Sequence, residues 1–220
     1  MKKNIISIIL NLIVVISTTI FVYLGVTGGA GEGQLGLGMV GIGYFKAYTI
    51  DSNILGAISS ILVIISNILV LKYNNNKLSY YSELIQYSAS ICLTLTFLVV
   101  TFFLAPSEVI NGRSYFIMFS KDMFFFHLLN PILVSISFLI LNNKNSFKFK
   151  EAIISTIPTI IYSIIYIVMV VIINKWEDFY NFTFGGRYMF IPIVLISIFT
   201  IIYVISKVYI NIHNKNVKKL

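Results

Sequence analysis

Six apolar segments, each about 20 residues long, constrain this chain more than any other feature of its sequence. A helix of about 20 mostly apolar residues is long enough to cross the hydrocarbon core of a bilayer. The polar stretches between the segments are too short to hold a separate domain. We therefore expect an all-α polytopic membrane protein, a single domain over residues 1–220 with six transmembrane helices in one bundle. The predicted spans are 4–26, 48–71, 81–105, 122–141, 152–174 and 188–206.

The composition excludes several other classes of protein. Only 11% of the residues are charged and 58% are hydrophobic, whereas soluble domains carry about 25% charged residues. A soluble enzyme, a disordered chain and a disulfide-rich secreted module are all disfavoured. Cys92 is the single cysteine, so no disulfide can form within the chain. The net charge of +8 does not indicate nucleic acid, because there is no soluble basic domain to bind it.

The positions of the basic residues predict the orientation in the membrane. When alternate flanks of the six spans are assigned to opposite sides, the side with both termini holds eleven of the sixteen Lys and Arg residues. Cytoplasmic loops carry the excess of Lys and Arg, so we expect cytoplasmic N- and C-termini. The first segment is longer than a signal-peptide core and is expected to be a retained helix. A chain rich in Ile, Asn and Lys suggests a bacterial source, and hence the bacterial plasma membrane.

A glycine-rich stretch follows the first span, over residues 27–43. Residues 31–36 fit the pattern G-x-G-x-x-G, which in dinucleotide-binding proteins follows a strand and opens a helix. Here the pattern follows a predicted membrane helix instead. We therefore expect a flexible or re-entrant external loop and no nucleotide site.

Two polar clusters lie near the external ends of the second and fourth spans. Thr49, Ser52 and Asn53 are spaced i, i+3, i+4, and so share one helix face. On the fourth span His127, Asn130 and Pro131 show the same spacing. At 1.5 Å per residue, Thr49 and His127 differ in depth by about 5 Å. We expect the two polar faces to meet inside the bundle.

These side chains are the parts of an acyl-transfer site: a hydroxyl nucleophile, an imidazole base, and amide or hydroxyl donors for an oxyanion. Ser and Asn side chains also bond across membrane helices merely to pack them, and Thr49 could cap its helix. His127 is harder to explain by packing, because its burial between Phe126 and Leu128 costs desolvation with no obvious gain. No second His or Cys occurs at its level, so we expect no metal and no organic cofactor.

Three more side chains are candidate pocket residues. Asp51 lies within the Thr49 motif but points away from the polar face, and Tyr162 and Tyr166 share a face of the fifth span. For the two tyrosines, core packing is the competing interpretation. The second histidine, His213, falls in the Lys- and Asn-rich tail and is given no role.

At these residues the sequence resembles a known family. The run from Tyr48 to Asn53 is similar to the "T-x-x-S-N" start of the second helix of bacterial six-span proteins of the Pr-six-Pr type, relatives of the animal androgen-induced and androgen-dependent TFPI-regulating proteins. The run from His127 to Pro131 resembles their "H-x-x-x-P" in the fourth helix. Helix count, spacing and cytoplasmic termini are similar over nearly the whole chain. The animal proteins carry a second nearby His and a His-Thr pair, which this sequence lacks around His127.

The resemblance implies an activity. The animal members are threonine hydrolases that cleave fatty acid esters of hydroxy fatty acids, which implies that Thr49 is the nucleophile and His127 its base. We expect an intramembrane hydrolase of a lipid-like ester, a membrane lipid being the partner, with Ser52, Asn53 or Asn130 as oxyanion donors. The alternative is a non-enzymatic bundle, either a small transporter or a protein that binds a lipid or a partner.

Overall fold

The computed structural model describes residues 1–29, 39–142 and 144–218, and the glycine-rich G-x-G-x-x-G stretch lies outside these ranges. Within the described residues the fold is helical without a strand, and six helices are long and apolar enough to cross a membrane. The expected all-α six-helix architecture is confirmed. The spans are Lys2–Thr27, Tyr48–Tyr73, Ser79–Ile110, Asp122–Leu141, Phe149–Ile172 and Tyr188–Val217.

The first three spans form one side of the bundle. Helix α1 (Lys2–Thr27) packs along α2 (Tyr48–Tyr73), and α2 packs along α3 (Ser79–Val99). A short 3-10 segment, η1 (Gly41–Lys46), leads into α2. The third span continues past α3 through η2 (Val100–Leu104) into α4 (Ala105–Ile110).

The last three spans are more segmented. After η3 (Tyr115–Phe119), the fourth span consists of α5, η4, α6 and η5, and the fifth consists of α7, α8 and η6. The sixth is η7 (Tyr188–Phe190) followed by the long α9 (Ile191–Val217). The remaining bounds are α5 Asp122–Phe124, η4 Phe125–Leu129, α6 Asn130–Ile136, η5 Ser137–Leu141, α7 Phe149–Ile154, α8 Ile157–Ile167 and η6 Val168–Ile172.

Four of these segments, η2, η4, η5 and η6, are π-helical turns. Two of them are followed closely by a proline: Pro106 lies two residues after η2, and Pro131 lies two residues after η4. A proline cannot donate to the carbonyl four residues earlier, and its ring crowds that carbonyl. For Pro131 that residue is His127. The wide π-helical turn η4 therefore places His127 at a point where the regular backbone hydrogen bonds of the helix are interrupted.

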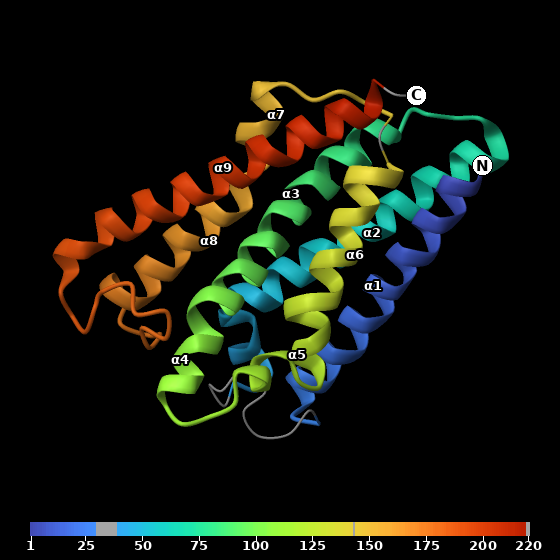
Figure 1. The fold of residues 1–220 in the computed structure, drawn as a ribbon. Helices are drawn as coiled ribbons and strands as arrows, with labels where there is room; N and C mark the ends of the chain where they lie inside the picture. The colour runs from blue at the N-terminus through green and yellow to red at the C-terminus, as the bar shows by residue number, and fades with distance from the viewer. Residues whose placement is uncertain (30–38, 143, 219–220) are drawn as a thin grey trace.

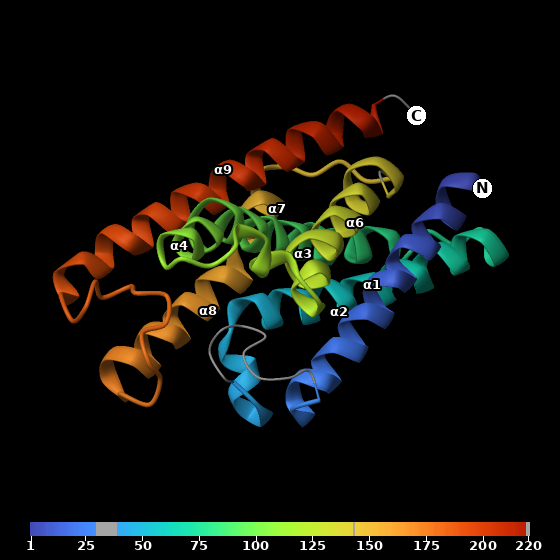
Figure 2. The same ribbon diagram turned by 60° about the horizontal axis from the view of Figure 1, so that its bottom comes forward.

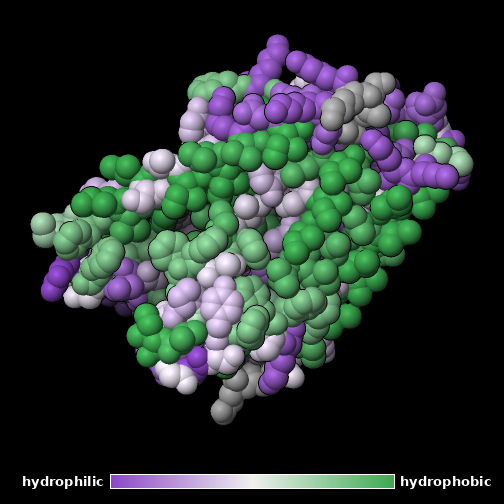
Figure 3. Space-filling view, viewed as in Figure 1, coloured by the Kyte–Doolittle hydropathy of each residue, from purple (hydrophilic) through white to green (hydrophobic). Residues whose placement is uncertain are grey.

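Both termini lie at the same end of the molecule (Figure 1). On the face shown in Figure 3, hydrophilic side chains gather at that end and hydrophobic side chains cover the helices. By the positive-inside rule we expect this end to face the cytoplasm, and we call it the Lys-rich end. The helices reach the opposite end in two groups, since α8 and α9 diverge there from the other spans (Figures 1 and 2).

Apolar side chains point outward along much of the bundle, and polar side chains fill much of its interior. Ile196 and Ile164, for example, are exposed, whereas Asn11, Gln86 and Asn130 are completely buried. Lipid tails are as apolar as an isoleucine side chain, so burying isoleucine gains little in a membrane; hydrogen bonds and close packing join the helices instead.

Candidate active site

The two polar faces meet through one carboxamide. Asn53 Nδ2 donates to the carbonyl of Thr49 at 2.8 Å and to the carbonyl of Phe126 at 3.1 Å. Its Oδ1 accepts from Asn130 Nδ2 at 2.9 Å. The side chain of Asn53 thus joins the first turn of α2 to the π-turn that carries His127.

The neighbouring polar groups extend this contact across the bundle. Asn130 also donates to Thr18 at 3.2 Å and accepts from Ser17 at 2.9 Å. Ser52 bonds to the carbonyl of Thr49 and to the hydroxyl of Thr96, both at 3.0 Å. The donors expected to face an oxyanion are therefore engaged in helix packing. An oxyanion role would require one of these hydrogen bonds to be exchanged for the substrate.

His127 is held in one tautomer. Its Nδ1 lies 2.6 Å from the carbonyl oxygen of Met118, and a carbonyl can only accept, so Nδ1 carries the proton. The lone pair is therefore on Nε2. His127 is 1% exposed, and its Nε2 has no hydrogen-bond partner among the described residues. A buried nitrogen without a hydrogen-bond partner costs folding free energy. A neutral imidazole with a free lone pair is, however, the form that a general base requires.

Thr49 is the second residue of α2 and does not cap it. The N-cap is Ala47, and no side chain caps this end of the helix. Among the hydrogen bonds of the described residues, none involves the hydroxyl of Thr49. The side chain lies instead on the wall of a cavity of about 90 Å³. The positive end of the α2 dipole favours a developing negative charge at this position.

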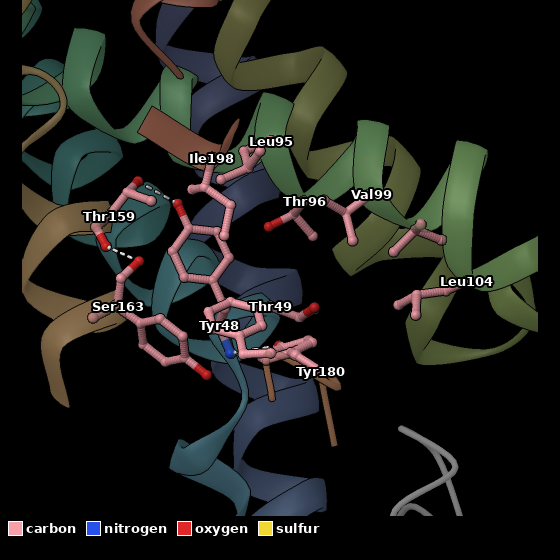
Figure 4. A pocket seen from close by; sticks show the side chains of 13 residues that line it. Tyr48, Thr49, Leu95, Thr96, Val99, Leu104, Thr159, Ser163, Tyr180 and Ile198 are labelled. Carbon is pink, nitrogen blue, oxygen red and sulfur yellow. Dashed lines mark hydrogen bonds between the residues drawn. The ribbon is translucent and has the colours of Figure 1, made fainter. Parts of the chain in front are cut away.

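Side chains from four spans and one loop form this cavity (Figure 4). Thr49 and Thr96 contribute hydroxyls from α2 and α3, and Ile198 contributes an apolar wall from α9. The loop contributes Tyr180, whose hydroxyl accepts from the Tyr48 N–H at 3.0 Å. Burial raises the pKa of Tyr180 to about 12, so its phenol is protonated at neutral pH. Most of the other lining side chains are apolar: Leu95, Val99, Val100, Leu104 and Phe182.

His127 is not among the residues that line this cavity. The structure thus joins Thr49 and His127 through Asn53 and the backbone, and exposes only Thr49 to the space. A proton can pass between them only through an intervening water or after a side-chain rotation.

The other three candidate pocket residues have separate places. Tyr162 lines the cavity of Thr49, and its hydroxyl donates to the Lys46 carbonyl at 2.7 Å. Tyr166 is completely buried and lies beneath the loop before α9, where its hydroxyl donates to Asp178 and accepts from the Tyr180 N–H. Asp51 lines a second cavity, between α2 and α8.

Asp178 organises the loop that supplies Tyr180. Its carboxylate accepts from the N–H groups of Phe182 and Thr183 at 2.9 and 2.8 Å, from the hydroxyl of Thr183 at 2.7 Å, and from Tyr166 at 3.0 Å. Burial raises the pKa of Asp178, but the hydrogen bonds from Thr183 and Phe182 outweigh it, and the net pKa is lowered. A charged Asp178 therefore positions the end of the cavity nearest the loop.

Unpaired buried polar atoms gather at the end opposite the termini. Among the described residues, these are the hydroxyls of Tyr44 and Thr101, both carboxylate oxygens of Asp122, and Nε2 of His127, with Ser60 deeper in α2. Native proteins satisfy nearly all buried polar groups, and the exceptions call for an explanation. A site that binds a polar ligand group or water would explain their clustering.

The Lys-rich end shows the opposite pattern. Asn142 accepts from Ser7 and Asn67 and donates to Gln86 and Ser137, at 2.8–3.1 Å. Sequence reasoning missed this network, because its members are single Ser, Asn and Gln residues far apart in the chain. The i, i+4 pair Ser7 and Asn11 was its one local signal.

His213 was also misjudged from the sequence. It is completely buried rather than part of a polar tail, and it stacks on Phe138 at a centroid distance of 4.3 Å. Both ring nitrogens face carbonyl oxygens, those of Phe138 and Asn145. Its position indicates a structural role at the Lys-rich end.

In comparisons with family models, with curated proteins and with solved structures, nothing matches this chain. The described residues also contain no group of three or more His, Cys, Asp or Glu side chains that could hold a metal ion.

Proposed function

We propose that this protein is an intramembrane hydrolase that cleaves a lipid-like ester through Thr49 as nucleophile and His127 as general base. The observation that carries the proposal is the unpaired Nε2 of His127, held in its proton-accepting form one residue beyond the carbonyl that Asn53 binds. Thr49, at the other end of the same Asn53 contact, has its hydroxyl on a cavity wall.

The proposed reaction has two halves. Thr49 Oγ1 attacks the acyl carbonyl as its proton passes to His127 Nε2, through an intervening water or after a side-chain rotation. The tetrahedral intermediate then collapses, its C–O bond breaks, and the leaving alkoxide takes the proton from His127. Water hydrolyses the acyl-threonine by the same route, which regenerates both side chains. The bond from Nδ1 to the Met118 carbonyl stabilises the imidazolium that forms in each half.

The cavity favours an apolar acyl group. Its walls are mostly the aliphatic and aromatic side chains of α3, η2 and the loop before α9. Its lining side chains come from α2, α3 and η2 on one side and from α8, α9 and the loop before α9 on the other. A lipid ester in the leaflet at the end opposite the termini could reach this site without crossing the bilayer, and water could reach it from the nearby surface. The substrate class is therefore an ester of a fatty acid, such as a fatty acid ester of a hydroxy fatty acid.

A non-enzymatic lipid-binding bundle is the second candidate. The observation in its favour is that Asn53 and Asn130 already donate their amide hydrogens to other groups of the protein, and not to an oxyanion. In that case the cavity would hold an acyl chain without reacting with it.

Hydrolysis by the purified protein separates the two candidates. We expect the wild type to cleave fluorogenic long-chain acyl esters and fatty acid esters of hydroxy fatty acids in lipid nanodiscs. Thr49→Val, which keeps the shape but removes the hydroxyl, should lose at least about 100-fold in rate, and Thr49→Ser should retain activity. Ser163→Ala is the matched control, since it removes a hydroxyl from the same cavity that bonds to a carbonyl of its own helix. Equal hydrolysis by the wild type and Thr49→Val would exclude this mechanism.

A further inference from the structure

A second, larger cavity of about 570 Å³ lies between α2 and α8. This volume is in the range of sites for drug-sized ligands, about 300–1,000 Å³. The rings of Phe45 and Trp176 and the side chains of Leu55, Pro158, Ile161 and Ile165 form its apolar walls. Tyr48 and Tyr162 line this cavity and also that of Thr49, so this ring pair, packed edge to face at 5.0 Å, stands between the two spaces.

Among the described residues that line the second cavity, Asp51 is the one charged side chain. Within the described part of the chain, its carboxylate has neither a hydrogen bond nor an ion pair, and the one salt bridge found there joins Arg113 to Glu108. Asp51 lies in the first turn of a membrane-spanning helix. Asp51 is half-buried; the dipole of α2 favours its charge there, but an unpaired carboxylate beside apolar walls remains costly.

The neighbouring lysines do not supply the missing partner. Lys46 and Lys175 are close to Asp51 and Trp176 in the chain, but they line a different space together with Glu177. The cavity of Asp51, which is partly open, therefore combines a single negative charge with mostly apolar and aromatic walls. Its complement is a molecule with one positive charge on an apolar body.

We propose that this cavity binds a single-chain alkylammonium compound, with its ammonium group on Asp51 and its alkyl chain against Leu55, Ile161 and Ile165. Aromatic rings attract cations over their faces, and Trp176 and Phe45 supply such rings at the same site. The volume suits a free single-chain amine and not the two chains of an aminophospholipid. Thr49 does not line this cavity, although Ser52, a candidate oxyanion donor, does, so amine binding can be tested apart from the nucleophile of the proposed hydrolysis.

Trp176 provides a specific probe, because it is the only tryptophan in the chain and it lines this cavity. The experiment measures Trp176 fluorescence of the full-length protein in phosphatidylcholine nanodiscs during titration with a primary alkylamine of about twelve carbons that is brominated on the chain. Bromine quenches tryptophan on contact. The alcohol of the same length and bromination is the uncharged comparison.

We expect saturable quenching by the amine at concentrations at least tenfold lower than by the alcohol, and displacement by the unbrominated amine. Asp51→Asn should reduce this preference for the amine at least tenfold. Glu177 is an external carboxylate outside the cavity, so Glu177→Gln should keep the preference for the amine. Thr49→Val should also keep this preference, even if the variant no longer hydrolyses esters. Equal quenching by amine and alcohol in the wild type would overturn the proposal, and this result requires no variant to fold. An unchanged preference in a folded Asp51→Asn protein, or loss of amine binding when phosphatidylethanolamine is added to the nanodiscs, would also overturn it.

Discussion

The Nδ1 atom of His127 lies 2.6 Å from the carbonyl oxygen of Met118, in the 3-10 segment that precedes the fourth span. This contact fixes both the tautomer and the orientation of the ring. It leaves a basic nitrogen without a partner inside the bundle, at a π-turn that Pro131 follows. The proposed base is therefore positioned by a group outside its own helix, and the effects of the base and of its support can be tested separately.

His127→Asn separates the two roles. The amide NH₂ of asparagine can replace Nδ1–H as donor to Met118, but asparagine has no basic nitrogen in place of Nε2. We expect a loss of about 10²–10⁴ in the rate of ester hydrolysis, with little change in thermal unfolding. The rate is measured with a fluorogenic acyl ester, and unfolding by circular dichroism in detergent.

His127→Phe is the informative comparison, since it removes the donor as well. It should lose activity to the same extent and also lose stability, because the Met118 carbonyl then lacks its partner. Wild-type activity in His127→Asn would show that Nε2 is not the base.

Gly25 in α1 is required by the ring of Tyr44. A methyl group at position 25 would come within 2.2 Å of the Tyr44 Cζ atom, which is buried against α1 just before α2 begins. We expect Gly25→Ala to destabilise the protein by about 1–3 kcal/mol through overpacking. Because η1 leads into Thr49, the substitution should also reduce hydrolysis.

Gly43→Ala is the matched control for Gly25→Ala, since a Cβ at Gly43 would meet no atom within 4 Å. Both variants are compared by thermal unfolding. Stability equal to that of the wild type in Gly25→Ala would contradict the packing described for Tyr44.

The spans could be predicted from the sequence because lipid imposes a simple rule on length and polarity. The fourth span begins and ends as expected, at Asp122 and Leu141. The sixth was expected to end at residue 206 but continues to Val217. The last turns of α9 are more polar than the predicted span, but they still pack against the bundle. Asn214 bonds to Phe147, and His213 bonds to Asn145. Such contacts between distant polar residues leave no trace in local hydropathy.

The candidate site could be predicted in part. Helical spacing correctly indicated that the faces of Asn53 and Asn130 meet, because i, i+4 geometry is local. It could not show that Thr49 and His127 face different surroundings, since that depends on the π-turn and on Met118 in a separate segment. Nor could it show that Asp51 lies in the wall of a cavity, because α8 supplies the other wall.

Asn142 tests the network at the Lys-rich end. Its carboxamide makes hydrogen bonds to four side chains, and such bonds contribute on average about 0.6 kcal/mol each in a membrane protein. We expect Asn142→Ala to destabilise the bundle by about 2 kcal/mol. Asn76→Ala, at an exposed position in the loop after α2, should change stability by less than about 0.5 kcal/mol. Similar midpoints of thermal unfolding for the two variants would mean that the network does not join the spans.

Asp178 should make the loop before α9 sensitive to acid. Its pKa in the folded protein lies below the ordinary value of 3.8, because its charged form accepts hydrogen bonds from Thr183 and Phe182. Its contribution to stability is therefore complete above pH 3.8 and is lost as the pH falls through the lowered pKa. Trp176, in the same loop, should show a fluorescence change below about pH 4 that depends on Asp178.

Asp178→Asn should shift the Trp176 signal already at neutral pH and abolish the acid transition, whereas Glu177→Gln should titrate like the wild type. An unchanged transition in Asp178→Asn would assign it to another carboxyl group.

Covalent labelling of Thr49 tests the proposed mechanism most directly. The full-length protein in nanodiscs is treated with a long-chain alkyl fluorophosphonate, and the modified residue is located by mass spectrometry of its peptides. We predict a phosphonyl adduct on Thr49 that is absent in Thr49→Val and strongly reduced in His127→Asn, and that an excess of fatty acid ester suppresses. An adduct on another residue, or labelling of the same extent in Thr49→Val, would contradict the assignment of Thr49 as the nucleophile.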